Sequence, residues 1–123
     1  MSDTCLSFYL KAYRIHVHVD ALRKIGSPRI ICFLLGDDGN AIALAPYSKK
    51  DFHSHRVPGN VYAGDGGLEL SSFPLCSLLV SKHKWNPNCS YRVPGELVDG
   101  SKIILFDLTA AEIIETRKNE STE

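Results

Sequence analysis

The sequence predicts an α+β fold, a small mixed domain of short strands and β-hairpins with two or three short helices. Residues 13–19 alternate between apolar and polar side chains, as a strand with one buried face does. Asp-Gly pairs at 38–39 and 99–100 follow apolar stretches and mark hairpin turns. Residues 73–84 carry leucines at helical spacing, which indicates an amphipathic helix.

The N-terminal segment, residues 1–12, alternates in the same way, and two alternatives remain for it: an extra edge strand or an extended arm. After the strand at 13–19, Asp20 offers a side-chain oxygen as a helix N-cap. Residues 21–25 then make one or two helical turns, which Gly26 ends.

A hairpin follows the short helix. Residues 30–35 are a continuous apolar run of strand length, and Cys32 within it is expected in the core. Residues 37–40 form the turn, and residues 41–44 return as a second strand. The polar, basic residues 46–57 are either a loop or a loop with a short strand at 52–57.

The second half begins after the Gly-rich residues 63–67, which are the expected seam between two halves. A short strand is expected just before this seam, at 61–62. Ser71 or Ser72 caps the helix at 73–84, which turns one face inward. The inward set is Leu75, Leu78 and Leu79.

The last elements are a hairpin and a helix. A strand at 91–98 contains Pro94-Gly95, which indicates an edge position or a bulge. The apolar return strand at 102–108 is expected to be central. Thr109 and Glu112 form a capping box for a final helix over 110–118.

At 123 residues the chain is expected to be a single domain over 1–118, with a disordered tail at 119–123. Its halves, 12–62 and 68–108, each run helix then hairpin. The tetrapeptide Arg-Val-Pro-Gly also occurs twice, 36 residues apart. The repeated helix-then-hairpin order and the repeated tetrapeptide do not share one register. Either turns recur by chance, or two related helix-hairpin units pack as a pair.

Composition limits the function classes. The formal net charge is zero, so a strong overall attraction to nucleic acid or to anionic membrane is not expected. Residues 1–60 nevertheless carry eight Lys/Arg against five Asp/Glu, a local excess of +3. Four widely spaced cysteines and the lack of a long apolar stretch indicate a cytoplasmic protein with reduced thiols and no membrane span.

The segment at 14–26, RIHVHVDALRKIG, resembles the opening of the AbrB/SpoVT type of swapped-hairpin DNA-binding domain. Members of that family open with a basic residue and an alternating strand, then a short helix, a Gly and a hairpin. The resemblance covers residues 13–44, a quarter of the chain. His18 stands where the family usually has a Pro, and the family module is about half this length and dimeric.

What the resemblance implies is an AbrB-like, DNA-binding transcriptional regulator, a homodimer that needs no cofactor. Cations on the first strand and short helix would neutralise phosphates. The positions that would carry this role are Arg14, Arg23, Lys24 and Arg29. The alternative interpretation of these residues is a set of ordinary solvated charges.

Two pairs of histidines are spaced like metal ligands. His16 and His18 lie two apart on a strand and point the same way, and His53 and His55 repeat the spacing. They are either a zinc site, if the segments meet, or plain surface residues. No nucleophile elbow, metalloprotease helix or phosphate-cradling Gly loop occurs, so a non-enzymatic protein is expected.

A protein-binding accessory module, of the kind found in phages and mobile elements, is the rival function. Aromatic side chains near turns would form its interface centre. These aromatic residues are Tyr47, Phe52, Tyr62 and Trp85. Trp85 at a helix end has a second interpretation, as a cover over the core.

Overall fold

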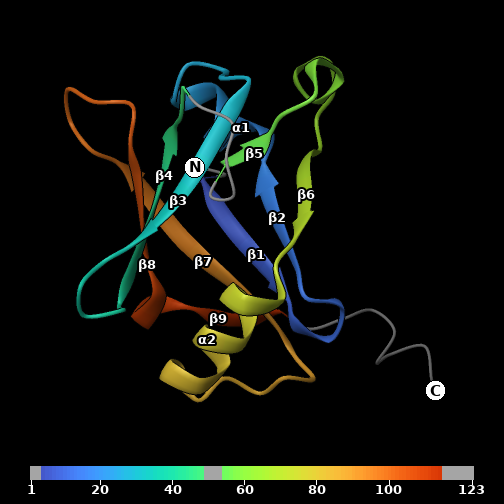
Figure 1. Ribbon diagram of the computed structural model, residues 1–123, viewed down its shortest axis with the longest axis vertical. Helices are drawn as coiled ribbons and strands as arrows, with labels where there is room; N and C mark the ends of the chain where they lie inside the picture. Colours follow the sequence, from blue (N-terminus) through green and yellow to red (C-terminus); the bar gives the residue numbers. More distant parts are fainter. Residues whose placement is uncertain (1–3, 49–53, 115–123) are drawn as a thin grey trace.

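The structure is a computed structural model that describes residues 4–48 and 54–114. The fold is mixed α+β and mostly strand, as expected, and the strands curl into a nearly closed antiparallel barrel (Figure 1). The strands are β1 (Cys5–Tyr9), β2 (Arg14–His18), β3 (Ile30–Leu35), β4 (Ala41–Pro46), β5 (Ser54–Arg56), β6 (Gly67–Ser71), β7 (Ser90–Leu97), β8 (Ile104–Asp107) and β9 (Glu112–Ile114). The α-helices are α1 (Val19–Lys24) and α2 (Phe73–His83), and the 3-10 turns are η1 (Leu10–Ala12), η2 (Gly59–Ala63) and η3 (Leu108–Ala110).

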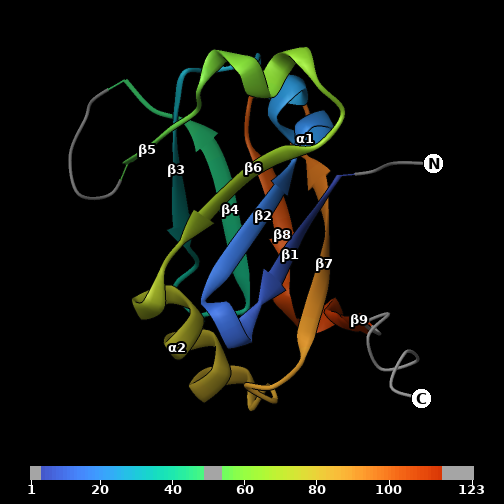
Figure 2. The same cartoon turned by 90° about the vertical axis from the view of Figure 1, so that its right-hand side faces the viewer.

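The sheet order is β5-β3-β4-β8-β7-β1-β2-β6, with β9 added beside β7. Strands from the two predicted halves interleave, because β4 pairs with β8 and β2 pairs with β6. Figure 2 shows α1 and η2 together over one end of the barrel, and α2 at the other end.

At the N-terminus a strand forms, as one of the two alternatives expected, but its predicted edge position is wrong. β1 lies between β2 and β7; it pairs with β7 over Cys5–Tyr9 and with β2 over residues 6–9. Its alternation therefore has a buried inner face, where Leu6 and Phe8 are fully buried, and an outer face.

The edge position predicted for β7 is also wrong. From Ser90 to Pro94 this strand pairs with β1, and from Gly95 to Leu97 it pairs with β8. A Cβ added at Gly95 would lie 2.4 Å from Cδ1 of the buried Phe106, so only glycine fits where the strand changes partner. Pro94-Gly95 thus marks the point inside the sheet where β7 changes its partner from β1 to β8.

Several local predictions change. His18, and not Asp20, is the N-cap of α1, because its Nδ1 accepts the Asp20 backbone N–H at 3.1 Å. Ser72 does cap α2, but Leu78 is 45% exposed and Cys76 takes the inward place. Residues 61–62 lie in η2 and not in a strand.

The final helix predicted over 110–118 does not form in the described part. Asp107 accepts the Thr109 backbone N–H at 3.0 Å, which supports η3, and Glu112–Ile114 then pairs with β7 as β9. Pairing with β7 gives the backbone N–H and C=O groups of Glu112–Ile114 more hydrogen-bond partners than an isolated helix turn would. Residues 115–118 and the tail at 119–123 lie outside the described residues.

The core fills the barrel and extends under α2. Trp85 is 8% exposed; its ring stacks on Tyr91 with centroids 4.5 Å apart and lies 5.5 Å from Phe8. Its second interpretation, as a cover over the core, is therefore confirmed, and it is not an exposed interface aromatic. Cys32 is buried, as predicted.

Candidate functional site

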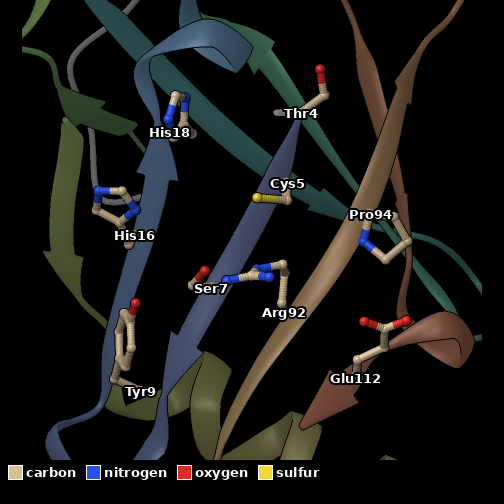
Figure 3. Close-up of a pocket in the computed structure, with 9 residues that line it drawn as sticks. All are labelled: Thr4, Cys5, Ser7, Tyr9, His16, His18, Arg92, Pro94 and Glu112. Carbon is tan, nitrogen blue, oxygen red and sulfur yellow. The ribbon is translucent and has the colours of Figure 1, made fainter. Parts of the chain in front are cut away.

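A shallow trough of about 490 Å³ runs along the outer face of β1. Cys5, Ser7 and Tyr9 form its floor, because alternate residues of β1 face away from the core (Figure 3). β2 forms one wall, and β7 with β9 forms the other. We call this site the β1 trough; it is lined by Thr4, Cys5, Ser7, Tyr9, His16, His18, Arg92, Pro94 and Glu112.

The strand register places one polar side chain from each of five strands in a single row across this face. Ser7 of β1 lies opposite His16 of β2 and Arg92 of β7. The row ends at Glu69, opposite His16, and at Glu112, opposite Arg92. Directly opposed residues on one face have Cβ atoms about 5 Å apart, so neighbours in the row can act on the same ligand.

The two histidines of the trough have different surroundings. The rings of His16 and His18 have centroids 6.4 Å apart. Because His18 Nδ1 accepts a backbone N–H, its neutral ring carries the proton on Nε2 and can donate there. Burial lowers the pKa of His16, and the nearby His18 adds to this, while the Glu69 carboxylate opposes it.

The alternation of β2 correctly predicted that His16 and His18 share a face. His55 lies instead on β5, with its ring 5.7 Å from that of Phe33, and His53 lies outside the described residues. Among residues 4–48 and 54–114, no three His, Cys, Asp or Glu side chains come together as metal ligands.

Arg92 is exposed and makes no ion pair or side-chain hydrogen bond with any described residue. Its side chain reaches from β7 over β1 toward Ser7 in Figure 3. Arg14, on the opposite wall, is tied to Glu69 at 3.0 Å. Of these two arginines, only Arg92 offers its guanidinium to a ligand without first breaking an ion pair.

A second charged region occupies the end of the barrel under α1 and η2. The Arg23 guanidinium donates to the backbone oxygens of Tyr62 at 2.9 Å and Gly64 at 3.2 Å, which joins α1 to η2. The Tyr62 hydroxyl donates to the Pro28 oxygen at 2.5 Å. We call the exposed cations here the basic end: Arg23, Lys24, Arg29, Arg56 and Lys102.

The remaining cations of the basic end come from two loops, from β5 and from the end of α1. Arg29 and Arg56 line one depression of about 710 Å³ together with Tyr62. The side chain of Lys102 lies beside Gly26. Lys24 hydrogen-bonds the hydroxyl of Thr4, which also lines the β1 trough.

The four cations that the resemblance selected are thus divided. Arg23, Lys24 and Arg29 share the basic end, whereas Arg14 lies at the start of β2, away from α1. Arg23 also has the Asp20 carboxylate 3.7 Å away. Sequence reasoning did not select Arg56 and Lys102, because they reach this end from β5 and from the segment before β8.

Sequence reasoning also did not select Ser7, Arg92 and Glu112. The alternation of Ser7 with Leu6 and Phe8 was visible, but only the pairing of β1 with β7 and of β7 with β9 brings the three together. The sequence held no signal for that pairing, since these strands are far apart along the chain.

Comparisons with known proteins add no identity: no family model, curated protein or solved structure matches the chain. The AbrB/SpoVT resemblance therefore rests on the sequence of residues 13–44 alone. Within the described ranges, the structure contains no helix of the length and apolarity needed to span a membrane.

Proposed function

We propose that the protein is an AbrB-like DNA-binding regulator that contacts the phosphate backbone through its basic end. The observation that carries this proposal is the gathering of five exposed cations from α1, β5 and two loops at one end of the barrel. Arg29, Arg56 and Lys102 make no ion pair or side-chain hydrogen bond with any described residue. Unpaired cations on one surface neutralise phosphates and release counterions.

This proposal changes the role expected of Arg14. The Arg14 guanidinium already pairs with Glu69 and lies away from the basic end, so it has no part in the proposed contact. The swapped-hairpin arrangement and the homodimer belong to the same proposal, because the resemblance implies both.

A gel shift with generic duplex DNA at low salt tests the proposal. The unmodified protein should bind, and the double variant Arg29→Ala/Arg56→Ala should bind more weakly on every sequence tried. Arg14→Ala is the matched control, an exposed arginine outside the basic end, and should bind as the unmodified protein does. Absence of low-salt binding at micromolar protein would refute the proposal.

An apolar row on the outer face of the barrel favours the second candidate, a non-enzymatic protein-binding accessory module. Leu34, Ala43 and Leu105 lie opposite one another across β3, β4 and β8, and the two leucines are 55% and 47% exposed. Solvent-facing apolar rows often mark protein interfaces. This candidate predicts a protein partner that is retained after nuclease treatment and lost on Leu105→Ser.

A further inference from the structure

We propose that the β1 trough binds a phosphorylated ligand that carries a planar ring, a ligand of the nucleotide class. The proposal does not depend on DNA binding, because none of the basic-end cations lines the trough. The volume of about 490 Å³ lies within the range of small-molecule sites.

Arg92 is the anchor for the phosphate. The backbone on either side of it is fixed, because β7 pairs here with both β1 and β9. A guanidinium presents several N–H donors in a planar fork that matches phosphate oxygens. No described residue occupies this fork, so binding a phosphate would break no existing ion pair.

Ser7 makes the recess into which the phosphate fits. Its small side chain is only 6% exposed, because it lies on the trough floor between the longer side chains of His16 and Arg92. A serine hydroxyl can donate one hydrogen bond from below. Further along the β2 wall, one two-residue repeat from His16, His18 can donate from Nε2, because its Nδ1 already accepts a backbone N–H.

Tyr9 supplies the surface for the ring. It is 37% exposed and lies one two-residue repeat from Ser7 on the same face of β1, a separation of about 6.8 Å. A flat ligand can therefore lie against the Tyr9 ring while its phosphate reaches Ser7 and Arg92.

The carboxylates make the trough selective. Glu69 is neutralised by Arg14, and Glu112 lies beside Arg92 as an exposed acceptor. The Glu112 carboxylate can accept hydrogen bonds from sugar hydroxyls, which inorganic phosphate lacks. The combination favours a nucleotide over inorganic phosphate.

Nuclear magnetic resonance titration of the whole chain at pH 6 tests the proposal, with adenosine 5′-monophosphate, adenosine and inorganic phosphate as probes. The monophosphate should shift the amide signals of β1, His16 and Arg92. Inorganic phosphate should bind more weakly and leave Tyr9 unshifted, and adenosine should bind weakest. A short oligoribonucleotide that shifts the same signals at lower concentration would also support the site. It would show that the phosphate bound there belongs to an RNA chain and not to a free nucleotide.

Variants separate the trough from the basic end. Arg92→Gln should lower the affinity for the monophosphate by roughly tenfold or more, since it removes a charged hydrogen-bond donor. Arg29→Gln, the matched control, should leave this affinity unchanged, and Tyr9→Leu should reduce only the advantage over inorganic phosphate. The proposal is overturned if millimolar monophosphate shifts no trough signal, or if Arg29→Gln weakens binding as much as Arg92→Gln. Dispersed spectra check that each variant is folded.

Discussion

The β1 trough and the basic end both present exposed arginines, but they are built differently. The trough lies on paired strands, and its cation Arg92 stands among groups that donate or accept hydrogen bonds at fixed register positions. The basic end lies on α1, the end of β5 and two loops, with Arg29 and Arg56 in an open depression. Fixed donors suit one small ligand, whereas cations on loops suit a repeating polyanion.

The largest expected difference between the two regions is their tolerance of an added methyl group. On the trough side, Gly95 follows the lining residue Pro94 in β7, and its Cα faces the core. Gly95→Ala would place a Cβ against the buried Phe106 ring, and it should destabilise the protein by about 1–3 kcal/mol. Gly64→Ala, beside the basic end, meets nothing within 4 Å and should change stability by less than about 0.5 kcal/mol. Urea unfolding measures both, and equal losses would contradict the difference in construction.

A smaller loss is expected from the hydrogen bond that holds the basic end together. Tyr62→Phe removes the hydroxyl that donates to the Pro28 oxygen, and it should cost about 1 kcal/mol. The substitution should also weaken DNA binding while leaving monophosphate binding at the trough unchanged. Loss of both activities would mean that the two regions are not separate.

Removing the exposed Arg14–Glu69 pair should have less effect still. Both side chains are about half exposed, at 53% and 49%, so Arg14→Ala should cost no more than about 1 kcal/mol of unfolding free energy. High salt should reduce even that difference. A larger loss that persists in salt would show that Arg14 packs on β6 through its aliphatic chain.

Acidification should weaken the fold through His16 on the trough wall. Its folded pKa is lowered, first by burial, then by His18 and against the pull of Glu69, from the value of 6.5 that the unfolded chain keeps. The unfolded state thus binds more protons between the two pKa values. Stability is fully present above pH 6.5 and is lost as the pH falls through the folded pKa.

A denaturation series from pH 8 to pH 5 measures this loss, and His16→Gln should reduce it. Burial also lowers the pKa of His55, which contributes with the same sign, so the double variant His16→Gln/His55→Gln should flatten the curve further. Stability that rises on acidification would contradict the burial of both rings.

The sequence predicted the elements better than their neighbours. Residues 30–35 and the Ser72-capped α2 are local patterns, and both formed as expected. The central place of β1 could not be predicted, because alternation reports one buried face and not which strands lie alongside. The capping box at Thr109 and Glu112 misled for the same reason, since β7 offered Glu112 a partner strand.

The same contrast between local patterns and strand neighbours holds for the candidate sites. The shared face of His16 and His18 followed from the period of one strand. Arg92 and Arg56 could not be assigned to a site, because their positions depend on pairings between segments far apart in the chain. A pattern within one strand could be predicted from the sequence, whereas a set of residues that strand pairing brings together could not.

The salt dependence of DNA affinity tests the central claim of a basic end most directly. The logarithm of the association constant should fall linearly with the logarithm of the salt concentration for the unmodified protein. Arg29→Ala should make that slope shallower by about 1, and Arg14→Ala should leave it unchanged. Equal slopes for all three proteins, or a change confined to Arg14→Ala, would contradict the account.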